Sequence, residues 1–143
     1  WISEGRLTQL VYDRFTAKRR GIDTIPTLDA PCLSGGGSSL PTLQELIKGT
    51  ERAILVTNFW YIRTVNPTNL SLTGMTRDGT FLVENGAIVS AVKNFRFHES
   101  PLRVFNRIEA FTSPTEAITS ETGKLLVPAM TLRDFNFSSV TRF

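Results

Sequence analysis

The pattern of apolar and polar residues changes at Arg52, where the chain begins to resemble β-structure. The segment AILVTNFWYI that follows is rich in β-branched and aromatic residues and predicts a long buried strand. The residues Asn66-Pro67-Thr68-Asn69 predict a turn, after which LSLTG reads as a short strand. A second turn is expected at Asp78-Gly79.

The dipeptide Asn85-Gly86 lies between two apolar segments, Phe81 to Glu84 and Ala87 to Val92, and predicts a two-residue β-hairpin. This turn requires positive φ at both central positions, which Asn and Gly tolerate best. The hairpin predicts three facing pairs: Glu84 with Ala87, Val83 with Ile88, and Leu82 with Val89.

Strand periodicity continues to the end of the chain. In NFRFHESPL we expect Phe95 and Phe97 on one face and Asn94, Arg96 and His98 on the other. The segment GKLLVPAMTLRDFNFSS reads as a closing strand, in which Pro128 indicates an edge or a bulge.

Helical patterns are short. Residues 5–20 place Leu7, Leu10, Val11, Arg14 and Phe15 at helical spacing before Gly21, although Leu10-Val11-Tyr12 would also fit a strand. A second helix is expected near 42–48, because Thr42 and Glu45 form a capping-box pattern and Gly49 follows. Leu102 to Phe111 could form a short helix that Ser113-Pro114 would end.

These elements predict an α+β fold that is mainly antiparallel β, with a barrel- or sandwich-like sheet and one to three short helices. The regular helical crossovers of a parallel α/β sheet are missing. The 143 residues, 41% of them hydrophobic, have the length of one domain, and we expect a single domain over residues 1–143.

The composition argues against several classes of protein. The net charge is only +3 and Lys18-Arg19-Arg20 is the only basic run, so nucleic-acid binding is not favoured. No apolar run is long enough to span a membrane. Cys32 has no partner for an internal disulfide and is compatible with a reducing cytoplasm. Because the sequence starts at Trp1, we expect it to be part of a longer protein.

Few residues could carry chemistry. A transition-metal site requires three or four donors, but the chain has one His and one Cys, so His98 is read first as a polar residue on a strand surface. Cys–His catalysis would need contact between His98 and Cys32, which lies in a loop rich in Pro and Gly. Five carboxylates are candidates for an acid–base pair, but no spacing singles out two of them: Asp78, Glu84, Glu99, Glu109 and Asp134.

Aromatic and polar residues on the predicted strands suggest a binding surface. Phe59-Trp60-Tyr61 could line a groove, although alternating aromatic residues more often belong to a core. Polar side chains accompany them on the strands: Asn58, Arg63, Asn94 and Arg96. Such a surface could hold an extended peptide that adds a strand at a sheet edge.

Four segments in this order and spacing resemble the C-terminal domain of the TldD/PmbA family, which are metal-dependent peptidases historically labelled modulators of DNA gyrase. The segments are YDRFTAKRRG, GGGSSLPTLQELIKGTERAILVTNFWYIRTVNP, LTGMTRDGTFLVENGAIVSAVKNFRFHESPL and VPAMTLRDFNFSS. The resemblance covers nearly the whole chain, and its most specific part runs from Leu72 to Leu102.

The resemblance implies a larger, two-domain cytoplasmic peptidase that works as a homodimer or as a heterodimer of related subunits. Extended peptides would be cleaved in a chamber to which this segment contributes walls and dimer contacts. The family holds its divalent metal, with zinc the first candidate, through a His-Glu-x-x-x-His motif that is absent from these residues. The cysteine that some members carry before the final Val-Pro strand is also absent from Ile118 to Lys124.

We therefore expect no catalytic or metal-binding residue and no cofactor in this segment, which by itself should be inactive. Four polar residues near the hairpin are the candidates for contact with peptide: Arg77, Asn94, Arg96 and His98. The alternative function is a non-catalytic binding or assembly module, or an inactive partner subunit of such a peptidase.

Overall fold

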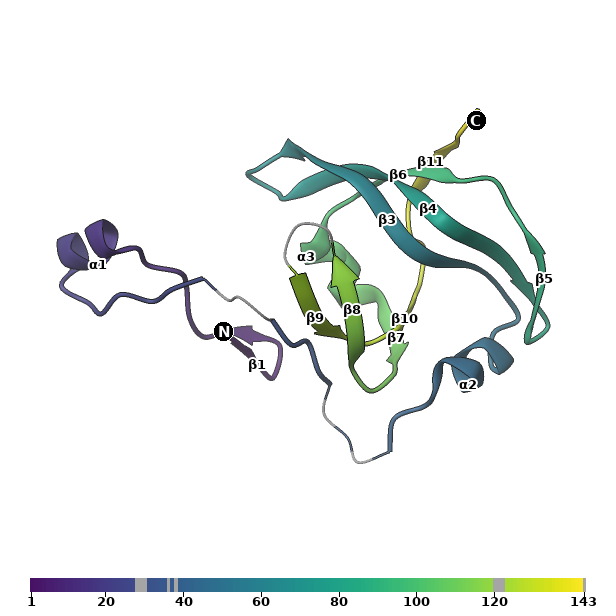
Figure 1. The fold of residues 1–143 in the computed structure, drawn as a ribbon, viewed down its shortest axis with the longest axis horizontal. Helices are drawn as coiled ribbons and strands as arrows, with labels where there is room; N and C mark the ends of the chain where they lie inside the picture. Colours follow the sequence, from purple (N-terminus) through teal and green to yellow (C-terminus); the bar gives the residue numbers. More distant parts are fainter. Residues whose placement is uncertain (28–30, 36, 38, 120–122, 143) are drawn as a thin grey trace. The chain divides into compact units, whose positions relative to one another are not determined.

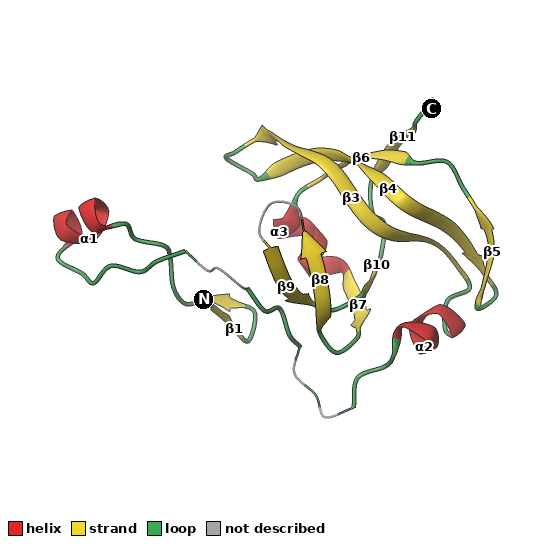
Figure 2. Ribbon diagram, viewed as in Figure 1, coloured by secondary structure: helices red, strands yellow, loops and turns green. Residues whose placement is uncertain are grey.

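The computed structural model describes residues 1–143 except 28–30, 36, 38, 120–122 and 143. Contacts between residues divide the chain into two compact units. One comprises Trp1–Cys32 and Glu116–Leu126, and the other comprises Leu33–Thr115 and Val127–Phe143. Strands dominate the described residues, and the helices are short (Figure 2). The predicted α+β class with mainly antiparallel sheets is confirmed.

The larger unit is organised by one antiparallel sheet. Its strands are β3 (Arg52–Asn66), β4 (Ser71–Glu84), β5 (Ala87–Ala91), β6 (Phe95–Glu99) and β11 (Phe137–Val140). The order is β11-β6-β4-β3, and β5 also pairs with β4. Figure 1 shows β3 and β4 as a long twisted hairpin. After the last residue of β4, the chain turns at Asn85-Gly86 and continues into β5.

The predicted turn at Asn85-Gly86 is confirmed, with φ values of 49° and 79°. Glu84 pairs with Ala87 and Val83 with Ile88, as expected. The third predicted pair is wrong, because the register shifts and Leu82 lies opposite Ser90. Val89 is therefore an extra residue in β5, a β-bulge that the spacing of apolar residues did not indicate.

The turn expected at Asp78-Gly79 is wrong, because β4 runs through these residues without reversing. Asp78 adopts φ 63°, and the register with β3 shifts there, so the dipeptide forms a bulge. The Asn58 amide donates to Asp78 Oδ2 at 2.8 Å, and the Thr57 hydroxyl donates to the Gly79 carbonyl at 3.0 Å. These bonds across the hairpin explain why a turn-forming dipeptide stays within a strand.

The outer half of β3 is not buried as expected. Its first half is largely half-buried, whereas every residue from Phe59 to Asn66 is exposed. β-Branched and aromatic residues favour a strand conformation, but the other layers of the fold decide which part of a strand is covered.

One face of the sheet packs around aromatic rings, which confirms the predicted alternation at Phe95 and Phe97. Phe97 is 5% exposed and lies across Gly74, where a β-carbon would come within 2.7 Å of its ring. Its ring centroid lies 5.1 Å from that of Phe59 and 5.7 Å from that of Phe135. This cluster extends through Phe137, so the aromatic residues on this face pack together around the buried Phe97.

Helix α2 (Leu43–Lys48) confirms the predicted capping box. The Thr42 hydroxyl accepts from the Glu45 N–H at 3.2 Å, and the Glu45 carboxylate accepts from the Thr42 N–H at 2.7 Å. Gly49 follows the helix as predicted. Figure 1 shows α2 beside the turn between β4 and β5, where the Gly86 N–H donates to the Thr50 carbonyl.

Replacing Thr42 with Ala should lower the free energy of unfolding by about 1 kcal/mol, because the N-cap hydroxyl would no longer accept the Glu45 N–H. Urea unfolding followed by circular dichroism measures this change. Thr68→Ala is the matched control, because Thr68 is exposed in the turn between β3 and β4. An equal loss in the two variants would contradict a specific role of the cap.

The helix expected over residues 5–20 is wrong in its first half. Ile2–Ser3 (β1) and Arg6–Leu7 (β2) form an antiparallel pair, and α1 covers only Arg14–Arg20. The Asp13 carboxylate caps α1 by accepting the Thr16 N–H, and Gly21 ends it at φ 66° as predicted. Tyr12 bridges Ile25, which agrees with the alternative strand reading at that residue.

The segment Leu102 to Phe111 divides into a helical and an extended part. Helix α3 (Pro101–Val104) and a 3₁₀ turn, η1 (Phe105–Arg107), lead into β7 (Ile108–Phe111). The closing strand is also divided, because β9 (Gly123–Val127) stops before Pro128 and β10 (Met130–Leu132) pairs with β7. Pro128 lacks the N–H that would continue the ladder. β8 (Thr115–Thr119) pairs with β9.

Candidate functional site

The second face of the main sheet carries a group of arginines, which we call the arginine face. Antiparallel pairing places facing residues on the same side of a sheet. One row contains Trp60, Met75 and Arg96, and the next contains Arg63, Thr73 and His98. Pairing therefore assigns residues of β3, β4 and β6 to this face: Asn58, Trp60, Arg63, Thr73, Met75, Arg77, Arg96 and His98. Tyr61 lies in the register shift between Trp60 and Arg63 and joins the face through its contact with Arg63.

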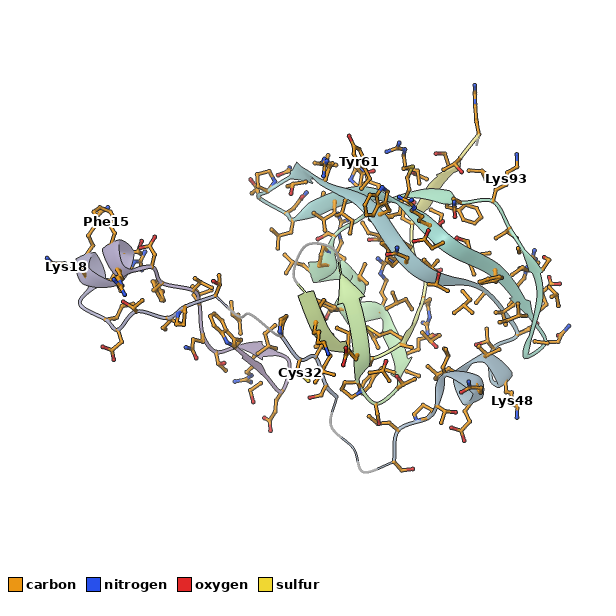
Figure 3. The ribbon with its side chains drawn as sticks, in the orientation of Figure 1. Phe15, Lys18, Cys32, Lys48, Tyr61 and Lys93 are labelled. Atoms are coloured by element: carbon orange, nitrogen blue, oxygen red, sulfur yellow. The ribbon has the colours of Figure 1, made fainter. Side chains whose placement is uncertain are left out.

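Two arginines of this face stack on aromatic side chains of β3. The guanidinium carbon of Arg77 lies 4.7 Å from the ring centroid of Trp60, and that of Arg63 lies 4.2 Å from the centroid of Tyr61. Tyr61 adopts φ 54° where the register of β3 shifts, and Figure 3 labels it on this strand. The stacking holds flexible arginine side chains over defined rings, and the N–H groups that do not bond to Ile62 or Asp78 remain available to a ligand.

The arginine face is exposed and positively charged. Trp60 is 41% and Tyr61 55% exposed, and the arginines of the face are exposed as well. The Asp78 carboxylate accepts from Arg77 Nε at 3.2 Å and from the Asn58 amide. Among the ion pairs between described residues, none involves Arg63 or Arg96. The face therefore carries uncompensated guanidinium groups.

The structure brings together three of the four residues predicted to contact peptide. Arg77, Arg96 and His98 belong to the arginine face. The expectation that Asn94 shares this face is wrong, because its side chain lies with Thr76, which is 1% exposed. Asn94 Oδ1 accepts from the Thr80 hydroxyl at 3.0 Å and lies 3.2 Å from that of Thr76. Asn94 precedes β6, so strand alternation did not govern its side chain.

A shallow depression of about 630 Å³ lies at the end of β6. It is lined by His98, Glu99, Arg103, Asn106, Arg107 and Asn136. Glu99 is nearly buried, and its carboxylate accepts from Arg107 Nη2 at 2.6 Å and from the Asn136 N–H at 2.9 Å. The Arg107 guanidinium also donates to the Asp134 carbonyl. This network joins β6, η1 and the segment before β11.

Burial is the largest single effect on the Glu99 carboxyl and raises its pKa, but several opposing effects together leave that pKa below its usual value. The Arg107 hydrogen bond, the backbone N–H groups of Asn136 and Ser100, and the Arg107 charge all favour the ionised form. Sequence reasoning included Glu99 only among unpaired carboxylates and did not find this network. No short sequence pattern could indicate this network, because Glu99 and Asn136 are far apart in the sequence.

The described residues do not fit a metal centre. No group of three or more His, Cys, Asp or Glu side chains among them could share an ion. His98 belongs to the larger unit, and Cys32, labelled in Figure 3, belongs to the smaller one. None of the helices in the described residues has the length and apolar character that crossing a membrane requires.

Comparisons with known proteins agree with this fold. The chain is similar to a crystal structure of TldE from Thermococcus kodakarensis, with a TM-score of 0.73 and 16% identity over 95% of this chain. The match spans only 32% of that TldE chain, and identity this low demonstrates the fold alone. A search of curated proteins found no significant match.

A family model gives the decisive match, because it extends over residues 1–139 and so over nearly the whole chain. Its description is the C-terminal domain of PmbA/TldA metallopeptidases. The resemblance seen in the four sequence segments is thereby confirmed. This chain belongs to the PmbA/TldA metallopeptidase C-terminal domain family.

Proposed function

We propose that residues 1–143 act as one C-terminal domain of a larger metallopeptidase that cleaves extended peptides. In this proposal the domain forms part of the wall of the substrate chamber and contributes to the contact between subunits. The family membership supports a peptidase assignment for the whole protein. The metal, with zinc the first candidate, would be held by residues outside this segment, because the described residues offer no suitable group of donors.

The observation that carries the proposal is the open edge of β3. This strand has 15 residues, and within the described chain it pairs only with β4. An unpaired edge offers N–H and C=O groups at the spacing of another extended chain. Because these groups belong to the backbone, they can hold peptides of different sequence in one extended conformation. An extended substrate is also the form in which a peptide bond is accessible to a peptidase.

Side chains next to this edge would orient the bound peptide. We propose that Arg77, Arg96 and His98 line the path of the substrate on the arginine face. Asn94 would act indirectly, because its carbonyl accepts from the Thr141 N–H and its amide oxygen holds the Thr76 and Thr80 hydroxyls. It thus positions the start of β6, on which Arg96 and His98 lie.

Backbone-methylated peptides test this mode of binding in the intact protein. Two peptides carry N-methyl groups at alternate amides, one on the odd and one on the even positions, so each lacks the N–H donors on one side of the strand. The peptide that lacks the donors facing β3 should bind about tenfold more weakly than the unmodified parent. Fluorescence anisotropy measures binding, and mass spectrometry of the unmodified peptide measures cleavage. Equal binding of the parent and both methylated peptides would contradict strand addition.

The same experiment separates the peptidase from a non-catalytic assembly module. A peptidase should cleave the unmodified peptide and lose this activity with a chelator. Binding without cleavage, in a protein that retains no metal on elemental analysis, would instead support the alternative of a binding module or inactive partner subunit. Light scattering of the intact protein, alone and with a related subunit, tests the proposed homodimer or heterodimer.

A further inference from the structure

We infer that the arginine face selects acidic side chains in an extended polypeptide bound at β3. This inference rests on the proposed function and adds a substrate class to it. The residues that would read the peptide are Arg63 and Arg77, and Arg96 adds to the positive field. Of these three, Arg63 was named from the sequence as part of a possible peptide-binding surface but not among the four candidate contact residues.

The position of the two stacked arginines supports the inference. Trp60 and Tyr61 both lie on β3, the strand with the open edge. Arg77 comes from β4, and its stacking on Trp60 brings its guanidinium to a side chain of the edge strand. Arg63 lies on β3 itself and stacks on Tyr61. An added strand lies roughly 4.8 Å from its neighbour, so long arginine side chains can reach its side chains.

The charges of the face favour carboxylates. A guanidinium presents a planar set of donors that matches a carboxylate in a bidentate arrangement. Arg63 donates one bond to the carbonyl of Ile62 at 3.1 Å, and Arg77 is paired in part with Asp78. Arg96 has no ion pair with the described residues. An acidic peptide would therefore complete the charge balance of this face.

The same stacking argues against a nucleic acid as the occupant. Single-stranded nucleic acids bind when their bases stack on free aromatic rings. The rings of Trp60 and Tyr61 each carry an arginine over one side, so a base would have to displace it there. The open edge of β3 also offers backbone groups that complement a polypeptide. A polypeptide with acidic residues on one side is thus the ligand that uses both features.

Two matched peptides test the inference with the intact protein. One alternates Glu with Thr and Val, and the other has Gln at each Glu position, so both can form the same strand. At low ionic strength we expect the Glu peptide to bind about tenfold more tightly by fluorescence anisotropy, and the difference should shrink as salt is added. The substitutions Arg63→Gln and Arg77→Gln should each weaken binding of the Glu peptide about threefold.

The Gln peptide serves as the control for binding itself, and Lys93→Gln as the control for net charge. Lys93 is exposed before β6 and lies outside the arginine face (Figure 3). Each arginine substitution should weaken binding of the Gln peptide less than binding of the Glu peptide, and Lys93→Gln should leave the preference for Glu intact. Unchanged circular dichroism and thermal unfolding would show that each variant remains folded.

The possible failures are distinct. If both peptides bind equally and the arginine variants do not change this, the inference is wrong while the proposed peptide binding stands. If neither peptide binds, the proposed function fails and the inference with it. If an oligothymidine displaces the Glu peptide and depends more strongly on Arg63, the face is a nucleic-acid surface and the inference is overturned.

Discussion

Replacing Arg107 with Met should lower the free energy of unfolding by about 3 kcal/mol near neutral pH. The substitution leaves the nearly buried Glu99 carboxylate without the cation that lies 2.6 Å away. The Arg107 side chain is itself 28% exposed, so solvent screening places the expected loss at the low end for a broken buried ion pair. Urea unfolding monitored by tryptophan fluorescence measures it.

The effect should depend on pH. The pKa of Glu99 is lower in the folded protein than the ordinary value expected for the unfolded chain. Its contribution to stability is therefore complete above about pH 5 and disappears as the pH falls through the folded-state pKa. Both Arg107→Met and Glu99→Gln should lessen this acid-dependent loss. A wild-type slope that persists in Glu99→Gln would show that another group controls it.

Arg133→Met provides the matched control for Arg107→Met. Arg133 pairs with Glu109 in the same unit, but both side chains are largely exposed. Exposed ion pairs contribute little to stability, so this variant should unfold close to the wild type. Equal destabilisation by the two substitutions would contradict the role assigned to burial of Glu99.

Replacing Gly86 with Val should lower the free energy of unfolding by about 3 kcal/mol, through backbone strain and a collision. Gly86 adopts φ 79°, which a β-branched residue strongly disfavours. A β-carbon there would also lie 2.7 Å from the Lys48 carbonyl oxygen. Relief of that contact would disturb the hydrogen bond from the Gly86 N–H to the Thr50 carbonyl at 2.9 Å.

Gly49→Ala is the control for this prediction. Gly49 has φ −81°, and a β-carbon added there would have ordinary contacts of 3.5 Å or longer. We expect a change within about 0.5 kcal/mol, measured by the same chemical unfolding. If Gly86→Val changed the free energy of unfolding as little as Gly49→Ala, the conformation of this turn would not be required to hold α2 against β5.

Local chemistry was sufficient wherever a few neighbouring residues decide the conformation. Asn85-Gly86 combines two residues that tolerate positive φ, and the hairpin forms as predicted. Thr42 and Glu45 satisfy each other's backbone donors across one turn, so α2 also begins where predicted. The alternation at Phe95 and Phe97 correctly indicated a buried face, since successive side chains of a strand point to opposite sides.

Predictions failed where pairing between strands overrode the pattern of a single segment. Asp78-Gly79 has the composition of a turn, but Asn58 and Thr57 hold it as a bulge within β4. Helical spacing of apolar residues before Asp13 did not produce a helix, because β1 and β2 pair there instead. The extra residue Val89 shifted one predicted pair of the hairpin. In each case the competing contact outweighed a weak local preference.

The sequence by itself determined the antiparallel character, the capping box of α2, the turn at Asn85-Gly86, the family of the chain, and the aromatic and polar faces of β6. Only the tertiary structure decided which arginines meet on one of these faces. Arg63, Arg77 and Arg96 come from three strands, and strand alternation alone cannot specify their neighbours. Each shift of register moves side chains relative to the next strand, so the arrangement of the face depends on the pairing of residues distant in sequence.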